Sequence, residues 1–547
     1  MQLKPKANFN VFLPLLLAVV LVIGMQIGFK MYEPFKGKVS SSGKDSTSNK
    51  LADIQEVFNY IDAKYVDDIT SDALIEDVIQ QALHDLDPHS SYIPASELGE
   101  VNEGLQGNFD GIGVEFSIVS DTIVVITAIA GGPSEKLGIT AGDKIIKIED
   151  TIVAGVKITN DKVTSRLRGE RGTSVKISVY RQGVPDLMDF EITRDEIPIY
   201  SLDASYIMSN KVGYIKINRF SATTYNEFAE ALYNLNEQGM ERLILDLRQN
   251  PGGYLTAAVN MVDEFLPDDN LIVYTEGRKV KRKEYYSKRR GMFENGPLVI
   301  LIDEGSASAS EIVAGAIQDW DRGLIVGRRS FGKGLVQEQY ELSNKAALRL
   351  TIARYYTPSG RSIQKPYVGN QDRESYDDEI KKRFDDGELF HPDSLKNMPD
   401  SLKFETKIEK RIVYGGGGIM PDVYVPLDTT NTTPMLLRAR VLVPRYIYDY
   451  YSNHKTEFAQ YSNGNTFDAF KNNFTVTPAM WNGFKTLVQK EVKKGYSETN
   501  LNQDKNDLQL MMKAYLARQL YKADKFYPII YDIDKGLKKA YEEIMKM

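Results

Sequence analysis

The chain of 547 residues contains no cysteine and only four histidines. Without cysteine there is no thiolate nucleophile, no thiolate metal site, no lipid-modified amino-terminal cysteine and no disulfide. The histidines are His84, His89, His391 and His454, and none lies in a zinc-ligand spacing such as His-x-x-x-His. We therefore expect no metal and no cofactor, and a hydrolytic mechanism has few bases to draw on.

A strong charge of one sign is also missing. The formal net charge is −7, and Lys and Arg are scattered along the chain instead of forming a basic stripe. Nucleic acid is therefore not an expected partner. With 42% hydrophobic and 26% charged residues, the composition is that of a globular protein, and the length suits roughly three or four domains.

One long apolar run stands near the amino terminus. Residues 11–29 contain no charged side chain, and this length is close to the roughly 20 residues that a helix needs to cross a bilayer. No convincing small-x-small cleavage site follows, so residues 1–50 are expected to hold a retained anchor and a Ser-rich linker at 40–50. A cleaved signal peptide is the alternative. Either way, the remainder is expected on the exported side of the cytoplasmic membrane, periplasmic or extracellular.

The next two segments differ in their hydrophobic pattern. Residues 51–106 have apolar positions at helical spacing and predict two or three helices, the last of which ends at LDPHSSY. Residues 107–196 consist of short β-branched runs separated by turns, which predicts a β domain.

The remaining chain divides into two further segments. Residues 197–426 alternate strand-like and helix-like runs, which predicts an α/β core with a crossover-connected sheet. A charged stretch at about 365–411 is expected to form a surface insertion in this core. Residues 427–547 have helical periodicity and predict an extension that caps the core or contributes to a homo-oligomer.

A pair of glycines begins the β domain. In FDGIGVEF, Gly111 and Gly113 can leave backbone N–H groups pointing to one place, a nest that holds a carboxylate. Together with GGPSEKLGITAGDKIIKIED, this stretch resembles a PDZ domain. The resemblance implies that proteins with accessible, apolar C-termini are the partners, because PDZ domains grip the terminal carboxylate of an extended peptide. The peptide-binding residues implied are Gly111, Ile112, Gly113 and Val114.

Three serines follow an apolar run in IDEGSASASEIVAG, namely Ser306, Ser308 and Ser310. A serine hydroxyl is a poor nucleophile until a neighbouring base takes its proton. No histidine lies between His89 and His391, and the Gly-x-Ser-x-Gly elbow is absent. Neither the local motif nor the histidine positions support a histidine triad.

A lysine is the base that remains. FGKG places Lys333 between two glycines, just after the strand-like run GLIVG. Glycines on both sides allow a sharp turn and a close approach of neighbouring groups. A lysine packed there would lose solvation and have a lowered pKa, and the neutral amine is a base.

At this point the sequence resembles a known family. GSASASEIVAGAIQD followed by FGKGLVQ is similar to the carboxyl-terminal processing proteases, or tail-specific proteases, which use a Ser–Lys dyad and carry a PDZ domain. LDPHSSY, GYIKINRF, LDLRQNPGG and YYTPSGRSIQ extend the similarity from about Leu51 to Val425. The resemblance implies that Ser308 is the nucleophile, Lys333 the base and Gln337 the residue that orients the lysine.

The same site needs donors for a developing oxyanion. The N–H of Ala309, next to the nucleophile, is one candidate, and Gly252 or Gly253 in NPGG supplies the other. Asp246 and Arg248 are expected to hold this loop and not to perform chemistry.

The neighbouring serines and arginines receive other roles. Ser306 and Ser310 are expected to cap the start of a helix. Arg166 and Arg168, at the flank of the PDZ-like segment, are candidates for a latch that couples tail binding to assembly of the site. A PDZ domain that only tethers the substrate is the alternative.

Two other functions remain open. Ser330 and Lys333 spell Ser-x-x-Lys, the motif of penicillin-binding proteins and some β-lactamases, which would make the protein a cell-wall acyl-enzyme. Its companion elements Ser-Asp-Asn and Lys-Thr-Gly are missing, and the motif should open a helix whereas FGKG resembles a turn. The second alternative is a PDZ scaffold that binds tails without catalysis.

The sequence therefore predicts a multidomain α/β protein with a helical N-terminal segment, a PDZ-like β domain, an α/β serine protease core and a helical C-terminal extension. The expected function is that of a serine endopeptidase that recognises protein tails through the PDZ domain. It would cleave exported or membrane proteins near their C-termini by a Ser–Lys dyad.

Overall fold

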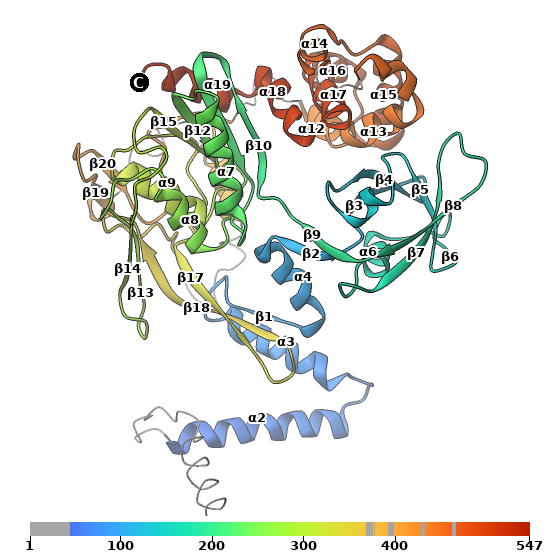
Figure 1. Ribbon diagram of the computed structural model, residues 1–547. Coiled ribbons are helices and arrows are strands. Elements are labelled where there is room, and N and C mark those ends of the chain that lie inside the picture. Colours follow the sequence, from blue (N-terminus) through green and yellow to red (C-terminus); the bar gives the residue numbers. More distant parts are fainter. Residues whose placement is uncertain (1–43, 368–375, 377, 392–398, 428–432, 462–465) are drawn as a thin grey trace, which may run out of the picture. The chain divides into compact units, whose positions relative to one another are not determined.

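A computed structural model of the protein describes residues 44–367, 376, 378–391, 399–427, 433–461 and 466–547 (Figure 1). The chain divides into two units, residues 1–79 and 80–547, and each is described by itself. The apolar stretch at 11–29 lies outside the described residues. None of the helices described is both long enough and apolar enough to cross a membrane.

The first unit contains helix α2 (Lys44–Lys64) and the beginning of α3 (Ser71–His84). The two helices confirm the predicted helical N-terminal segment. Helix α2 begins within residues 40–50, which the sequence predicted to be a flexible linker, so that prediction is wrong from Lys44 onward. The physical reason is that no glycine or proline interrupts the chain between Lys44 and Lys64.

Beyond α3, the LDPHSSY turn leads into strand β1 (Ser91–Ile93) and helix α4 (Ala95–Gln106). The carboxylate of Asp87 accepts hydrogen bonds of 2.8 Å from two backbone N–H groups of this turn. Strand β1 pairs antiparallel with β18 (Ala347–Tyr356). The turn therefore joins the end of the helical segment to a sheet of the core.

The predicted β domain is present between β2 (Asn108–Gly111) and β9 (Asp195–Pro198), which pair antiparallel where the chain enters and leaves it. Its sheet has the order β3-β4-β5-β7-β8, with β6 paired to β5. These strands and the two helices are β3 (Val114–Val119), β4 (Thr122–Ala128), α5 (Pro133–Lys136), β5 (Lys144–Ile148), β6 (Thr151–Ile152), α6 (Asn160–Leu167), β7 (Ser174–Tyr180) and β8 (Met188–Thr193). On β7, Val175, Ile177 and Val179 are fully buried, as the period of two along a strand predicts.

The predicted α/β core is confirmed. Its main sheet has the order β10-β11-β12-β15-β16-β21, in which β10 runs antiparallel to β11 and every other pair is parallel. The strands are β10 (Leu202–Ile207), β11 (Val212–Ile217), β12 (Arg242–Asp246), β15 (Leu298–Ile302), β16 (Leu324–Gly327) and β21 (Val423–Tyr424). The loops that follow β12, β15 and β16 leave from the same edge, since the strands are parallel.

Helices cover both faces of this sheet (Figure 1). Ile300 of β15 packs in the same hydrophobic cluster as residues of α7, α8 and α9, whereas Leu301 packs with residues of α19. The helices are α7 (Thr224–Glu237), α8 (Leu255–Val262), α9 (Ala309–Asp319) and α19 (Lys535–Ile544). In the amino-acid sequence, a strand that is buried on both faces appears as a continuous run of apolar residues. Helix α19 therefore caps the core, one of the two roles predicted for the C-terminal extension.

A second sheet has the order β1-β18-β13-β14, and β17 also pairs with β18. Its further strands are β13 (Leu271–Glu276), β14 (Lys283–Tyr286) and β17 (Leu335–Glu341). Strand β17 begins directly after the FGKG turn, so this sheet carries one side of the predicted site.

The charged stretch at about 365–411 does not lie only on the surface. The structure describes α11 (Glu379–Asp385), a short 3-10 helix and the hairpin of β19 (Lys403–Glu405) with β20 (Ile412–Tyr414). Lys365 and Arg383 are only 2% exposed, which corrects the prediction of a surface insertion. Their charges are tolerated inside because Glu379 forms an ion pair with each of them.

The rest of the C-terminal extension forms a helical bundle with a hydrophobic cluster of its own, in which Phe470 and Phe484 are fully buried. Helices α12 and α15 begin alike, with a threonine whose hydroxyl accepts a backbone N–H bond and a proline at the first helical position. The helices are α12 (Pro434–Arg440), α13 (Val443–Asn453), α14 (Phe467–Asn473), α15 (Pro478–Glu491), α16 (Glu498–Gln503), α17 (Lys505–Leu520) and α18 (Tyr527–Ile530).

Candidate active site

Ser308 occupies a sharp turn between β15 and α9. Its backbone has φ 54° and ψ −112°, a region that residues other than glycine rarely adopt. Strain of this kind persists only where the surroundings impose it, and it clusters at active sites. The strand–turn–helix arrangement has the shape of a nucleophile elbow, although the Gly-x-Ser-x-Gly sequence is absent.

The two neighbouring serines have their hydroxyl groups engaged elsewhere. Both are fully buried. The Ser306 hydroxyl donates to the carbonyl oxygen of Leu247 (2.8 Å), and the Ser310 hydroxyl donates to that of Asn250 (2.9 Å). The predicted helix caps are therefore wrong, because these buried carbonyls need partners and the serines supply them. Ser308 is half-buried, and of the three it is the serine that a substrate can reach.

One buried carboxylate joins the serine turn to the lysine turn. Glu311 accepts hydrogen bonds from the backbone N–H of Ser308 (2.8 Å) and of Lys333 (2.9 Å), both at Oε2. Its other oxygen accepts from the Gly332 N–H (2.7 Å) and from the Ser330 hydroxyl. Burial raises the pKa of Glu311, although the hydrogen bonds that it accepts oppose the shift. The backbones of Ser308 and Lys333 are thus held as neighbours.

Lys333 has the environment that a general base requires. Its ammonium donates to Gln337 Oε1 (3.2 Å), and Gln337 Nε2 donates to the carbonyl oxygen of His89 (2.6 Å). The second bond fixes the amide with its oxygen toward the lysine. Burial, and then the positive charge of Arg349, hold the pKa of Lys333 below its usual value, against the opposing charges of Glu311 and Asp87.

The serine hydroxyl and the lysine ammonium are not hydrogen-bonded to each other in the part of the chain that the structure describes. Nucleophile–base bonds are often loose in ligand-free enzymes and tighten when substrate binds.

Tyr355 adds a further link between the two turns, since its hydroxyl lies within hydrogen-bond distance of the carbonyl oxygens of Ser308 and Lys333.

The loop after β12 lies against the serine turn. Gly252 has φ 95°, and a Cβ atom there would stand 2.7 Å from Ser308 Cβ and 2.8 Å from the nitrogen of Ala309. The Gly252 N–H donates to Asn250 Oδ1 (2.9 Å). The N–H groups of Gly253 and Ala309 have no hydrogen-bond partner among the described residues. These two groups are therefore the ones available to an oxyanion.

The alternative pairing of Ser330 with Lys333 is not supported by the geometry. Ser330 is fully buried, and its hydroxyl is engaged by Glu311 and by the N–H of Ile419 (2.6 Å). The chain from 328 to 334 forms no helix, whereas the Ser-x-x-Lys motif opens one.

His89 contributes its backbone carbonyl to the site. Its ring Nε2 lies 2.8 Å from the hydroxyl of Tyr376, while its carbonyl oxygen orients Gln337. No group of three His, Asp or Glu side chains that could hold a metal ion occurs within the described ranges.

The peptide-binding residues predicted in the β domain line a small cavity of about 90 Å³. Ile112, Gly113 and Val114 line it together with Leu167 of α6. Gly111 ends β2 and does not line the cavity. Its lining residues are Phe109, Ile112, Gly113, Val114, Phe116, Thr164, Leu167 and Arg168.

Arg168 connects this cavity to the preceding helix. Its guanidinium forms an ion pair with Glu103 of α4 and lies 4.5 Å from the centre of the Phe109 ring. Burial raises the pKa of Glu103, and the charge of Arg168 opposes that shift. The other latch candidate, Arg166, lies in the last turn of α6 and does not line the cavity.

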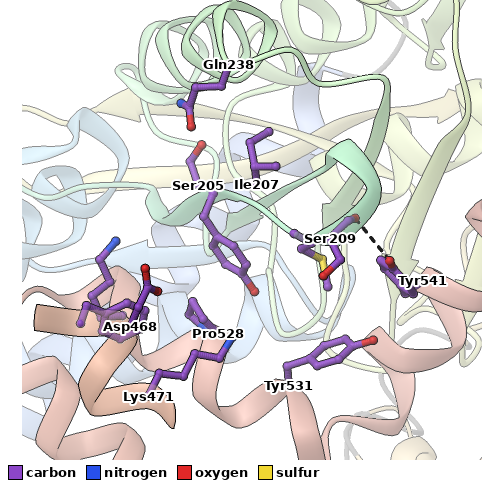
Figure 2. Close-up of a pocket in the computed structure, with 13 residues that line it drawn as sticks. Ser205, Ile207, Ser209, Gln238, Asp468, Lys471, Pro528, Tyr531 and Tyr541 are labelled. Carbon is purple, nitrogen blue, oxygen red and sulfur yellow. Dashed lines mark hydrogen bonds between the residues drawn. The ribbon is translucent and has the colours of Figure 1, made fainter. Parts of the chain in front are cut away.

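A separate cavity of about 810 Å³ lies between β10 and the C-terminal helices. Figure 2 shows Ser205 and Ile207 on one side, and Pro528 and Tyr531 on the other. None of the predicted catalytic or peptide-binding residues lines it.

Comparison with known proteins agrees with this architecture. Residues 211–371 match peptidase family S41, residues 111–192 match the PDZ domain, and residues 435–522 match a family of unknown function, DUF8443. A carboxy-terminal-processing protease of Bartonella bacilliformis is 36% identical over 60% of this chain and 75% of its own length. The carboxy-terminal processing protease CtpB of Bacillus subtilis is 32% identical over 62% of this chain and 72% of its own length.

Among solved structures, a photosystem II D1 C-terminal processing protease is 30% identical, with a TM-score of 0.33, over 58% of this chain and 91% of its own. The family matches, together with the α/β core and the PDZ domain, make this protein a serine protease. The chain belongs to the carboxy-terminal processing proteases of peptidase family S41.

The close approach at Gly252 generates a first prediction. We expect Gly252→Ala to lower kcat/KM by about 100-fold or more, because the added Cβ would collide with the serine turn. Gly239→Ala is the matched control, since Gly239 also has positive φ (82°) but no atom within 4 Å of the added Cβ. Steady-state cleavage of an unfolded reporter protein would compare the two variants. Equal activities would show that the loop tolerates displacement.

Proposed function

We propose that Ser308 is the nucleophile and that neutral Lys333 is the general base. Lys333 takes the hydroxyl proton while Ser308 Oγ attacks the scissile carbonyl carbon. The resulting ammonium then gives the proton to the leaving amine, and an acyl-enzyme on Ser308 remains. Water, deprotonated by the same amine, hydrolyses the ester and restores both residues.

The oxyanion of each tetrahedral intermediate is stabilised by backbone N–H groups. We assign Ala309 as one donor, and Gly253 in preference to Gly252 as the second. What supports this choice is that the Gly252 N–H is already engaged by Asn250. Gln337 keeps the amine of Lys333 in place, and its own amide is anchored on His89.

One observation favours this assignment above the others. Ser308 combines a strained backbone with a half-buried position, whereas the hydroxyls of Ser306, Ser310 and Ser330 are all buried and hydrogen-bonded. The buried lysine with a lowered pKa lies on the turn that shares Glu311 with Ser308.

Ser308→Ala and Lys333→Ala are each expected to lower kcat by about 10⁴-fold or more, because each removes a group that acts in bond breaking. Lys333→Arg is expected to be equally inactive, since arginine stays protonated. In the wild type, the rate should rise with pH through one ionisation below the usual lysine range, because the pKa of Lys333 is lowered and its neutral form reacts. Initial rates of cleavage of an unstructured protein with an apolar C-terminus would be measured for the three variants and, as a function of pH, for the wild type.

Two results would contradict the dyad. One is full activity in Ser308→Ala or Lys333→Ala, which would show that cleavage does not depend on this pair. The other is a pH–rate profile governed by a group near pH 6.5, the reference value for histidine. A loss of activity on adding a chelator would contradict the metal-free mechanism.

We further propose that the PDZ domain recognises the apolar C-terminal tails of protein substrates and that tail binding assembles the site. The cavity at Ile112 and Val114 is small and mainly apolar in its lining, which suits one apolar C-terminal side chain. Arg168, at the same cavity, is paired with Glu103 of α4. A terminal carboxylate would compete with Glu103 for this guanidinium and so loosen the link between α4 and the PDZ domain.

A peptide supplied in trans tests this gating. A short apolar peptide with a free carboxylate is expected to stimulate cleavage of a separate, tailless reporter by about 5- to 100-fold, the range of typical coupling between two sites. The stimulation should disappear with the amidated peptide and in Ile112→Glu. Arg168→Ala should cleave the tailless reporter without peptide, because the pair with Glu103 is lost.

Arg171→Ala is the control, since its ion pairs with Asp195 and Glu196 are exposed and do not involve the cavity. It should behave as the wild type. If saturating peptide leaves turnover of the reporter unchanged, the PDZ domain is a tether and gating is refuted.

We propose, finally, that residues 11–29 anchor the protein in the cytoplasmic membrane with the protease on the exported side. The support is the length and uncharged character of this stretch. The protein is expected to stay in the membrane fraction after a high-salt wash and to retain residues near Met1, as mass spectrometry of the purified protein would show. A mature amino terminus near residues 30–40 would identify a cleaved signal peptide instead.

A homo-oligomer also remains a proposal. Its support is an apolar set of side chains on α2 that are each more than half exposed, namely Ile54, Val57 and Tyr60.

A further inference from the structure

Arg248 is the second residue of the loop that leads from β12 (Arg242–Asp246) to Gly252 and Gly253. Its guanidinium lies between two carboxylates from distant parts of the sequence. On one side, Nε bonds to both oxygens of Asp246 (3.0 and 3.1 Å). On the other, Nη1 and Nη2 form a bidentate pair with Asp534 (2.8 and 2.7 Å). A bidentate arginine–carboxylate pair fixes orientation as well as position.

The backbone of Arg248 is held as firmly as its side chain. Its N–H donates to Asp246 Oδ1 (3.0 Å), and its carbonyl oxygen accepts from the ammonium of Lys216, which also contacts Asp246 (3.2 Å). The four groups carry two positive and two negative charges. Every hydrogen-bonding group of Arg248 is therefore tied to the sheet or to Asp534.

This network lies in a region of low solvent access. The side chain of Asp246 is 1% exposed, that of Arg248 21% and that of Asp534 19%. Burial alone would raise the pKa of Asp246, but the charges of Arg248 and Lys216 hold it well below its usual range. Charge attraction is strong where water is excluded, so loss of one carboxylate leaves Arg248 poorly compensated.

Asp534 stands on a rigid support. It caps α19 by accepting the N–H of Leu537 (2.9 Å), and Leu537 and Ile544 are buried against the main sheet. The hydroxyl of Tyr541 donates to the carbonyl oxygen of Ser209 (3.3 Å), as Figure 2 shows. The main sheet carries the loop after β12, and through α19, which packs on one of its faces, it also positions the carboxylate of Asp534.

The far end of the loop is hydrogen-bonded to the turn that carries Ser308. The carbonyl oxygen of Asn250 accepts the Ala307 N–H (3.0 Å) and the Ser310 hydroxyl (2.9 Å). A change in the position of Arg248 would pass along this short loop to the N–H of Gly253. Oxyanion donors lose their effect when they are displaced by about 1 Å.

We propose that Asp534 is a positioning residue for the protease reaction, acting through Arg248 to hold the oxyanion loop. Helix α19, which lies outside the region that matches peptidase family S41, is then part of the support of the active site. The inference rests on the proposed roles of Ser308 and Gly253. It assigns to the C-terminal extension an effect on catalysis in addition to capping the sheet.

The test is Asp534→Asn in the full-length protein. Asparagine is also a good N-cap, so α19 keeps its start while the charge opposite Arg248 is lost. We expect kcat to fall by about 10- to 100-fold, with KM for a tail-bearing substrate changed by no more than about twofold, because substrate binding is untouched. Asp534→Ser keeps a residue that can cap the helix, and it should likewise lower kcat while leaving KM nearly unchanged.

Asp532→Asn is the matched control. Asp532 is exposed, lies two residues away and makes no hydrogen bond through its carboxylate to the described residues, so its kcat should equal that of the wild type. A double-mutant cycle with Arg248→Ala should be non-additive, since both changes remove the same interaction. Thermal unfolding, followed by circular dichroism, confirms that the assay temperature lies below the transition of each variant.

Three results would overturn the inference while Ser308→Ala is inactive. The first is an unchanged kcat in folded Asp534→Asn, which would make the residue structural only. The second is a rise in KM at constant kcat, which would place its effect on substrate binding. The third is strict additivity with Arg248→Ala, which would show that it does not act through the loop. Full activity of Ser308→Ala would instead refute the proposed dyad itself.

Discussion

The buried carboxylate of Glu311 is the constraint on which the site depends. The serine turn follows β15 and the lysine turn follows β16, so no covalent element fixes the distance between them. A carboxylate has enough acceptor capacity for several donors, and this one accepts three backbone N–H groups and one hydroxyl. Because these donors offset the cost of burying the charge, the carboxylate fixes both turns at once. Substitution by glutamine would replace an acceptor with a donor and would separate them.

Other charged residues extend this support outward from the two turns. Arg383 of α11 is buried and donates to the carbonyl oxygen of Ser330 (2.9 Å), so the charged stretch predicted to lie on the surface holds the lysine turn. Arg248 plays the corresponding part for the loop of Gly252 and Gly253. In both places a guanidinium from one segment binds groups of another, which suits the fixed planar geometry of arginine. The active site is therefore surrounded by ionic contacts between segments that are far apart in sequence.

The sequence predicted most of the architecture because hydrophobic period and turn residues are local signals. The doubly covered sheet could be predicted from runs such as PLVILI, and motifs made Ser308 and Lys333 the candidates for the catalytic pair. What could not be read was long-range pairing. Local sequence predicts that Ser306 and Ser310 cap the nearest helix, whereas the partners of their hydroxyls lie about 60 residues away in the chain. The hydrogen bond from Gln337 to the carbonyl oxygen of His89 could not be predicted, because every residue has a backbone carbonyl and no side chain marks this one. The motif YYTPSGRSIQ was the only sequence feature that pointed to Tyr355, which contacts both turns.

Helix α19 has a consequence for the order in which the protein is made. The face of the sheet that carries Ile244, Val299 and Leu301 is covered by residues of α19, which leave the ribosome after every strand of that sheet. Until residues 535–544 are available, this apolar face lacks its cover and Arg248 lacks one of its carboxylates. A nascent chain that already contains the serine and the lysine is thus an unfinished protease, and the enzyme cannot reach its final packing before synthesis has passed helix α19.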